Sequence, residues 1–89
     1  MKNAKNINVQ LVTVTPSLAC EMLGTNPICD DLNEKKIQKY ARKMKSGHWK
    51  LRPTAIVFDE DYALINGRHR LWAVFEAGIP VKFLVAFIN

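Results

Sequence analysis

The sequence predicts a small α+β domain, a mixed β-sheet packed with helices in the order β-α-α-β-β-α-β. Three observations predict it: apolar, β-branched runs near both ends and in the middle of the chain, two segments with helical periodicity, and turn residues between them. The 89 residues are fewer than in most domains, so we expect a single domain over residues 1–89. Its polar start, residues 1–6, is expected to be flexible.

The first two elements follow from local chemistry. The β-branched run Val9–Val14 predicts a strand. Thr15 is a good N-cap and Pro16 suits the first helical position, which predicts a helix over Pro16–Leu23. Residues 25–31 carry turn chemistry without periodicity, so we expect a loop there.

The second helix is predicted to begin after Asn33, its cap, and to run to about Ser46. An apolar face recurs at the spacing i, i+3, i+4 and i+7. Its members are Ile37, Tyr40, Ala41 and Met44. The lysines of this segment lie on other faces, and Gly47 ends the helix.

The second half of the chain reads as a hairpin, a helix and a last strand. The hairpin has strands Pro53–Phe58 and Tyr62–Ile65 around the turn 59–61. A third helix is expected over Arg68–Ala77, and the last strand over Val81–Ile88. The side chains of the third helix available to the core are Leu71, Trp72, Val74 and Phe75.

Composition and charge narrow the class of protein. The hydrophobic content of 48% and charged content of 24% argue against disorder. The net charge of +5 favours a polyanionic partner such as a nucleotide or nucleic acid. The longest apolar run is far too short for a membrane helix. Cys20 and Cys29 are too few for a disulfide framework or zinc site, so we expect a cytoplasmic protein in which both are buried, reduced thiols.

The segment Asn66–Arg70 is the strongest candidate site. A strand that leads through Asn66 and Gly67 straight into a helix leaves the first helical N–H groups pointing outward, and these attract an anion. Gly67 lets the backbone approach a ligand closely. Arg68 and Arg70 add forked donors suited to phosphate, and His69 can donate or accept a proton. The pattern therefore predicts an anion-binding site.

The same five residues also fit a purely structural interpretation. Gly67 is then a turn glycine and Asn66 a helix cap. Arg68 and Arg70 are solvated or paired with acidic side chains, and His69 is a structural hydrogen-bonding residue. The local pattern leaves both interpretations open.

Two stretches resemble the second conserved box of the ParB/sulfiredoxin superfamily, strand–G-x-[HR]-R–helix–A-G–strand. They are Leu64–Ala73 and Glu76–Val81. Asn26-Pro27 resembles the N-P of the first ParB box, and the order of elements agrees over roughly residues 8–88. Short phage and plasmid members with G-x-W … D-G-x-H-R-L-x-A are more similar still, with Gly47-His48-Trp49 filling the first of these slots.

The resemblance implies a ParB/sulfiredoxin-like fold with a nucleotide pocket. This junction holds the phosphates of CTP in ParB, and of ATP in sulfiredoxin and in a free-serine kinase branch. Gly67, His69 and Arg70 match the phosphate-holding positions, and the implied cofactor is a nucleoside triphosphate with Mg²⁺. Arg68 occupies the slot of the sulfiredoxin catalytic cysteine, so sulfinic acid reductase activity is not expected.

Two departures from ParB limit what is carried over. Arginines follow N-P in ParB, whereas Ile28, Cys29, Asp30 and Asp31 follow it here. A nucleotide-contacting arginine is therefore missing, which argues against CTP hydrolysis. The helix-turn-helix and dimerisation domains of ParB proper have no counterpart in this sequence, so we do not expect a complete partition protein.

Carboxylates and basic residues elsewhere each have a functional and a structural interpretation. The adjacent acids at 59–61 could hold Mg²⁺, but adjacent acids in a hairpin turn are more often solvated residues that form the turn. No metal site is therefore predicted. Negative charge at the start of a helix stabilises the helix dipole. This role is favoured over that of a general base for Asp30, Asp31 and Glu34. The basic side of the second helix is either exposed to solvent or forms a rail that contacts nucleic-acid phosphates. Trp49 is either a core or rim aromatic or a residue that stacks on a base. The rail residues are Lys35, Lys36, Lys39, Arg42 and Lys43.

Two hypotheses of function follow. The first is a minimal ParB-like domain of a phage or other mobile element that binds a nucleotide or nucleic-acid phosphate at Asn66–Arg70 and acts in DNA-related processes. Any catalysis would be nuclease-like or nucleotide-hydrolysing, but no nucleophile or general base is evident, and binding needs neither. The second is a non-enzymatic inhibitor or adaptor that binds a host protein or blocks a nucleic-acid-binding surface. Neither involves a membrane, and the sequence leaves the oligomeric state open.

Overall fold

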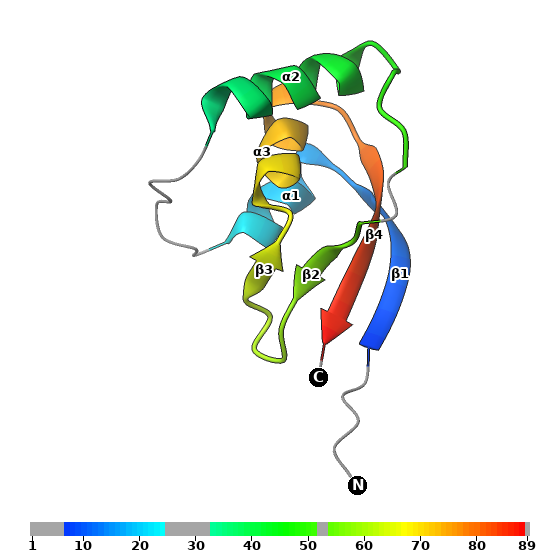
Figure 1. The fold of residues 1–89 in the computed structure, drawn as a ribbon, viewed down its shortest axis with the longest axis vertical. Helices are drawn as coiled ribbons and strands as arrows, with labels where there is room; N and C mark the ends of the chain where they lie inside the picture. Colours follow the sequence, from blue (N-terminus) through cyan, green and yellow to red (C-terminus); the bar gives the residue numbers. More distant parts are fainter. Residues whose placement is uncertain (1–6, 25–32, 52–53, 89) are drawn as a thin grey trace, which may run out of the picture.

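The computed structural model describes residues 7–24, 33–51 and 54–88. Within these ranges three helices and four strands follow one another in the predicted order (Figure 1). They are β1 (Ile7–Val14), α1 (Pro16–Leu23), α2 (Glu34–Lys45), β2 (Ile56–Phe58), β3 (Leu64–Asn66), α3 (Arg68–Ala77) and β4 (Val81–Ile88). The expected flexible start and the loop expected over 25–31 lie outside the described residues. None of the helices described here combines the length and apolar character needed to cross a membrane.

The four strands form one mixed sheet in the order β1-β4-β2-β3. β1 and β4 run antiparallel in an unbroken register, from the Ile7–Ile88 pair to the Val14–Val81 pair. β4 and β2 run parallel, whereas β2 and β3 run antiparallel. The predicted α+β class with a mixed sheet is therefore confirmed.

The helices lie together against the sheet, with α3 between α1 and α2 (Figure 1). This packing buries one contiguous apolar core between the two layers. Its largest fully buried side chains are Ile56, Leu71, Val14, Val74 and Val85. Because α3 is central, its first turn is held between β2 below it and α2 beside it, and this position creates the site described below.

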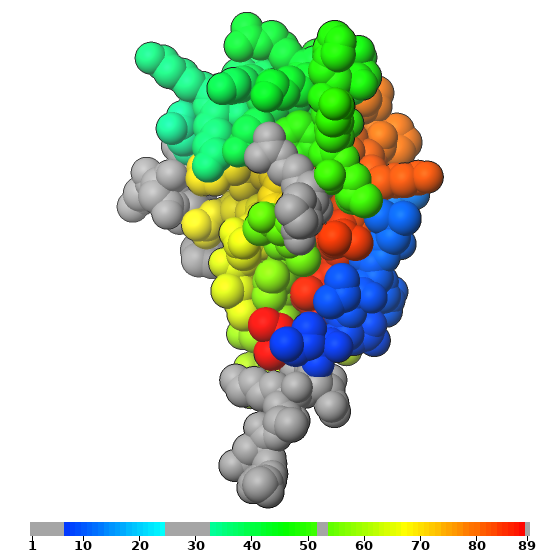
Figure 2. Space-filling model, turned by 45° about the vertical axis from the view of Figure 1, so that its right-hand side comes forward, coloured from blue at the N-terminus to red at the C-terminus, as the bar shows by residue number. Residues whose placement is uncertain are grey.

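β1 forms an edge of the sheet and exposes apolar side chains. Ile7, Val9 and Leu11 alternate along the strand, so they share one face, and each is more than half exposed. Val14, on the opposite face, is fully buried in the core. Figure 2 shows β1, in blue, along the border of the molecule beside β4.

The local signals placed three elements at their observed boundaries: α1, α3 and β4. Thr15 caps α1 by accepting a 3.1 Å hydrogen bond from the Leu18 N–H through its hydroxyl. Asn33 caps α2 in the same way, with its Oδ1 3.1 Å from the Lys36 nitrogen. α2 ends at Lys45 with Ser46 as its C-cap, as expected.

Both strands of the predicted hairpin are shorter than expected. The first was predicted from Pro53, which lies outside the described residues. β2 begins at Ile56, and the carbonyls of Thr54 and Ala55 before it accept hydrogen bonds from the Arg70 guanidinium. The second was predicted from Tyr62, but β3 begins at Leu64. Tyr62 has a φ of 60° and belongs to the turn, a conformation that a strand cannot contain.

Two expectations about burial are wrong. Phe75 was expected in the core but is 49% exposed, while Leu71 and Val74 are fully buried and Trp72 packs partly against the core. The Phe75 ring instead lies edge-on against Trp72, 6.0 Å away. Cys20 was expected to be buried but is exposed as a free thiol, because it lies on the outer side of α1. Cys29 lies outside the described residues.

Candidate anion-binding site

The junction between β3 and α3 is built around Gly67. Its φ of +112° lies in the region that favours glycine. A Cβ at this position would lie 2.8 Å from Cγ1 of Ile56, which is fully buried. The Gly67 carbonyl accepts the first helical hydrogen bond, from the Leu71 N–H at 3.0 Å. Only glycine allows the chain to turn this closely above β2.

The first turn of α3 has the features of an anion site. Gly67 is the N-cap and has no side chain to bond the following N–H groups. These N–H groups carry the positive end of the helix dipole, which favours a negative ligand.

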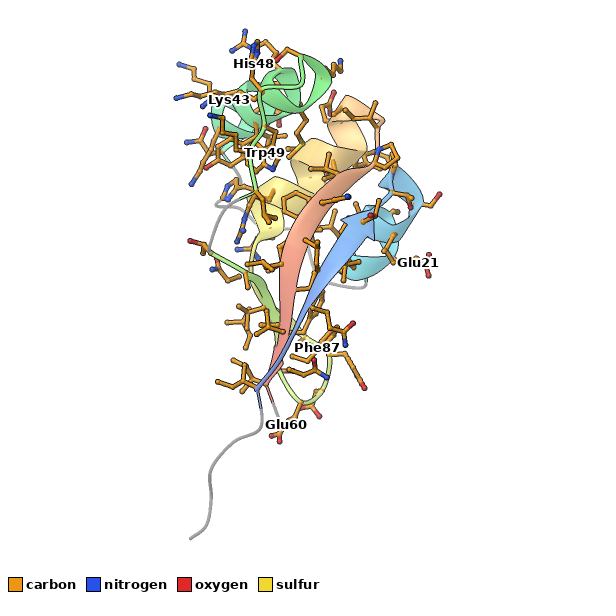
Figure 3. The ribbon with its side chains drawn as sticks, turned by 90° about the vertical axis from the view of Figure 1, so that its right-hand side faces the viewer. Glu21, Lys43, His48, Trp49, Glu60 and Phe87 are labelled. Carbon is orange, nitrogen blue, oxygen red and sulfur yellow. The ribbon has the colours of Figure 1, made fainter. Side chains whose placement is uncertain are left out.

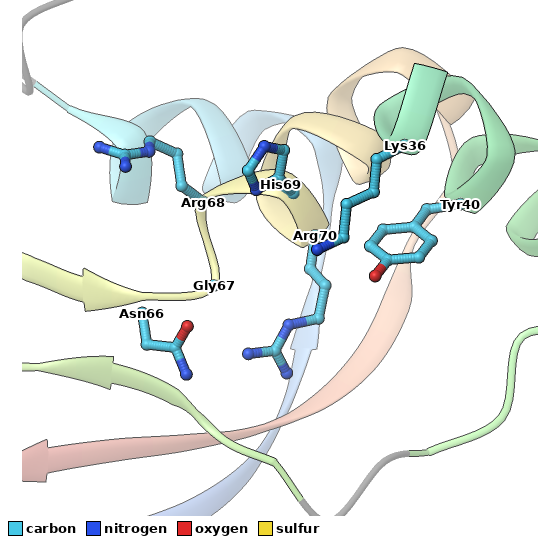
Figure 4. Close-up of a pocket in the computed structure, with 7 residues that line it drawn as sticks. All are labelled: Lys36, Tyr40, Asn66, Gly67, Arg68, His69 and Arg70. Carbon is cyan, nitrogen blue, oxygen red and sulfur yellow. The ribbon is translucent and has the colours of Figure 1, made fainter. Parts of the chain in front are cut away.

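A pocket of about 80 Å³ lies at this turn. Its lining contains all five predicted residues, Asn66, Gly67, Arg68, His69 and Arg70. Lys36 and Tyr40 of α2 complete it, and Figure 4 shows both reaching toward the start of α3. The pocket is therefore shared by two helices whose contributions are about 30 residues apart in the chain.

Tyr40 is the pocket residue that sequence reasoning missed. We expected it on the apolar face of the second helix, but it is only half-buried and presents its hydroxyl to the pocket (Figure 4). Lys36 was expected only on a rail for nucleic acid. The signal that could have found them is their i, i+4 spacing, which places both on one side of α2.

Arg70 is mainly committed to the fold. It is 8% exposed, and its guanidinium donates hydrogen bonds to the carbonyl oxygens of Thr54 and of Ala55, the second at 3.1 Å. These bonds fix the segment that leads into β2. Arg70 therefore contributes positive charge to the wall of the pocket while its nitrogens hold the backbone beneath.

His69 links the two helices of the site. Its Nε2 accepts a 3.0 Å hydrogen bond from the backbone N–H of Asn33, the N-cap of α2. An Nε2 that accepts places the proton of the neutral ring on Nδ1. The structural role considered for His69 is thus present, and the ring still lines the pocket.

The positive groups reach the pocket from different directions. Lys36 extends from α2 toward the first turn of α3, whereas the Arg68 guanidinium points to the opposite side (Figure 4). The Lys36 ammonium also lies 5.7 Å from the centre of the Tyr40 ring, a cation–π distance. Both helices thus contribute cationic residues to the lining of the pocket.

The predicted rail on α2 is divided by the helix geometry. Lys36 lines the pocket, and Lys43, seven residues later, follows on the same side. Lys35 and Arg42 are each one residue earlier and lie about 100° further round the helix. Lys39 lies between the two sets and is exposed.

Trp49 serves the packing of this region. Its ring lies edge-on to Tyr40 at 5.1 Å and to Phe83 of β4 at 6.1 Å, and it is half-buried. The core or rim position that the sequence allowed is the one observed. Trp49 thereby supports Tyr40, and through it the wall of the pocket.

The carboxylates considered as candidates lie elsewhere. Asp59 forms the turn between β2 and β3, where its Oδ1 accepts from the N–H groups of Asp61 and Ala63 at 2.8 and 2.9 Å. Glu34 begins α2 and accepts a 3.3 Å hydrogen bond from the Gln38 amide. Asp30 and Asp31 fall outside the described residues. Within the described part of the chain, no three His, Cys, Asp or Glu side chains are grouped as metal ligands.

The comparisons with known proteins add no relative. None of the protein families, curated proteins or solved structures with which the chain was compared matches it. The fold itself, a small α+β domain with a mixed four-stranded sheet and three helices among the described residues, is what the structure establishes.

Proposed function

We propose that this chain binds a phosphate group, carried by a nucleotide or a nucleic acid, in the pocket at the start of α3. One observation carries the proposal: cationic side chains from two helices, Lys36 of α2 and Arg68 and Arg70 of α3, line one recess at a helix N-terminus. The helix dipole and the cations act in the same direction, so an anion is favoured by both.

The lining favours binding over catalysis. Among the described residues of the pocket there is no carboxylate and no thiol, and the Nε2 of His69 already accepts from Asn33. A phosphate needs positive charge and donors, which Lys36, Arg68 and the Tyr40 hydroxyl supply. Hydrolysis would need a base that these residues do not provide.

The resemblance to the ParB/sulfiredoxin superfamily supports the same ligand. It matches Gly67, His69 and Arg70 to phosphate-holding positions, and it implies a minimal ParB-like domain of a phage or other mobile element. A nucleoside triphosphate with Mg²⁺ is the ligand implied by that likeness. The pocket, at about 80 Å³, accommodates one phosphate-sized group, since drug-sized ligands occupy roughly 300–1,000 Å³.

Thermal-shift titration tests the proposal, with pyrophosphate and with ATP, CTP and GTP in the presence of Mg²⁺. A ligand at 100 times its Kd stabilises the folded state by about 2.7 kcal/mol, which raises Tm by several degrees in a domain of this size. Lys36→Gln should weaken binding by roughly 10- to 150-fold, because a charge-assisted hydrogen bond contributes about 1.5–3 kcal/mol.

Lys45→Gln is the matched control. Lys45 lies on the same helix and is exposed, but it does not line the pocket. It removes the same charge from α2, so the titration should resemble that of the wild type. No shift with any phosphate ligand at millimolar concentration, or an equal loss in both variants, would reject the pocket.

A second candidate is favoured by a different observation. Ile7, Val9 and Leu11 expose an apolar stripe on the edge strand β1, a feature of protein-binding surfaces. The chain would then be a non-enzymatic inhibitor or adaptor that binds a host protein. This candidate predicts no thermal shift in the phosphate titrations. It also predicts that Val9→Lys loses partner binding, measured by co-purification with the host proteins.

A further inference from the structure

We propose that the partner of this site is a single-stranded nucleic acid, with one phosphate in the pocket and the following phosphates along the Lys36–Lys43 side of α2. The inference rests on the proposed phosphate site and names its ligand. We call the side of α2 that carries Lys36, Tyr40 and Lys43 the pocket flank.

The size of the pocket places most of any large ligand outside it. About 80 Å³ accommodates one phosphate-sized group. Apart from Tyr40 the lining is polar or charged, so it favours the phosphate and not the base of a nucleotide. A ligand that gains further binding energy must therefore find it next to the pocket, where α2 lies.

The charge of the chain is concentrated on α2. This helix carries six basic residues and one acidic residue, a net charge equal to the +5 of the whole chain. Figure 3 shows Lys43 and His48 at this end of the molecule and Glu60, in the acidic turn 59–61, at the opposite end. Such a separation steers a polyanion toward α2. In Figure 2 the side chains of α2 project outward from the upper end of the molecule.

The pocket flank has the spacing of a nucleic-acid backbone. Lys36 and Lys43 are seven residues apart, which is about 10 Å along the helix axis. A single strand is more extended than a strand wound in a duplex, which rises about 3.4 Å per phosphate, so this length corresponds to about two phosphates. A strand bound along the pocket flank, which we call the track, therefore begins in the pocket and stays on one face of α2.

The pocket flank is also held in place before a ligand arrives. Lys36 lies over the Tyr40 ring at 5.7 Å, Tyr40 packs against Trp49, and Trp49 packs against the buried Phe83 of β4. This chain of contacts connects the surface cation to the sheet. Fewer side-chain rotamers are then lost on binding, which favours affinity.

A single strand fits this arrangement better than a duplex. A helix in the major groove of a duplex presents both of its flanks to the DNA. Here the pocket lies on only one side of α2, while Lys35 and Arg42 point about 100° away from it. A strand that follows the pocket flank contacts Lys36 and Lys43 and leaves Lys35 and Arg42 in solvent.

Fluorescence anisotropy with a labelled oligothymidylate, measured between about 50 and 200 mM salt, tests the inference. Two phosphate contacts, one in the pocket and one at Lys43, give a slope of log K against log[salt] of about −1.4, since each contributes about −0.7 in a single strand. Lys43→Gln should flatten the slope by about 0.7. Lys45→Gln, the matched control two residues away, should leave it unchanged.

Pyrophosphate separates the failure of this inference from that of the pocket. Lys43 does not line the pocket, so Lys43→Gln should bind pyrophosphate as the wild type does, whereas Lys36→Gln should weaken both ligands. If pyrophosphate binds but Lys43→Gln leaves the oligonucleotide slope unchanged, the track is wrong and the pocket stands. If pyrophosphate does not bind, the proposed function fails and this inference fails with it.

A duplex arm completes the test. The expected result is weaker binding of duplex than of single strand, with little effect of Lys35→Gln/Arg42→Gln on either. If this double variant weakens binding as much as Lys36→Gln/Lys43→Gln, or if duplex binds more tightly, both flanks of α2 face the ligand and the single-strand proposal is overturned.

Discussion

The backbone N–H of Asn33 donates a 3.0 Å hydrogen bond to Nε2 of His69, across 36 residues of sequence. Asn33 caps α2 and His69 lies in the first turn of α3, so this bond holds the beginnings of two helices together. The pocket lies between these two beginnings. The Nε2 atom of His69 thus supports both the fold and the geometry of the candidate site.

His69→Ala should destabilise the protein by about 1 kcal/mol, because the Asn33 N–H loses its acceptor. His69→Gln should recover part of this loss, since its side-chain oxygen can accept in place of Nε2. Urea denaturation measures both. His48→Ala is the control: His48 is exposed and should change the free energy of unfolding by less than about 0.5 kcal/mol. Equal effects at the two histidines would contradict the role of the Asn33 bond.

Gly67→Ala should destabilise the fold by roughly 2–5 kcal/mol. A positive φ contributes about 1–2 kcal/mol of strain, and the clash with Ile56 adds about 1–3 kcal/mol of overpacking. Gly47→Ala isolates the first contribution, because Gly47 has a φ of +78° but no atom within 4 Å of its added Cβ. Guanidinium denaturation of both variants should give the larger loss for Gly67, and a similar loss at the two positions would show that Ile56 can move.

Arg70→Ala should destabilise the protein by about 3 kcal/mol. The change leaves the carbonyls of Thr54 and Ala55 without the charged donors that now bond them. Arg70→Lys should recover only part of the loss, because an ammonium cannot reproduce the fork of the guanidinium.

The comparison for Arg70 is Arg42→Ala on the exposed side of α2, which should change the free energy of unfolding by less than about 0.5 kcal/mol. Circular dichroism during urea unfolding follows all three variants. If Arg70→Ala kept wild-type stability, the hydrogen bonds to the segment before β2 would not matter for the fold. Because Arg70 is structural, variants of Lys36 are the better test of ligand binding.

Leu71→Ala should destabilise the fold by about 2–5 kcal/mol, since Leu71 lies on the buried side of α3 and is fully buried. Phe75→Ala, one turn later on the same helix, should have an effect below about 1 kcal/mol because its ring is half exposed. Urea denaturation midpoints give the comparison. A larger loss at Phe75 than at Leu71 would place the buried face of α3 differently from the one observed.

Much of the fold could be predicted because its signals are local. Thr15 and Asn33 cap their helices with their own side chains, and Gly78 ends α3 in a left-handed conformation, so these boundaries depend on neighbours in the chain. The cluster Asn66–Arg70 was found for the same reason, since five adjacent residues necessarily share one turn. The ParB-like identity and the nucleotide ligand stay predictions.

Tertiary contacts decided the rest. Local residue type could not indicate that β2 begins only at Ile56, because Arg70, far along the chain, takes the preceding carbonyls. Nor could it separate Phe75 from Leu71, both large and apolar, since burial depends on which side of α3 meets the sheet. The packing of Trp49 against Tyr40 and Phe83 likewise could not be read from its residue type.

By itself, then, the sequence determined the order of the elements, most helix boundaries and the cluster at Gly67, because capping, periodicity and turn chemistry act over a few residues. Only the tertiary structure decided that Lys36 and Tyr40 join that cluster and that His69 bonds to Asn33. These groups are brought together by packing α2 against α3, and the geometry of that packing is set by the whole core.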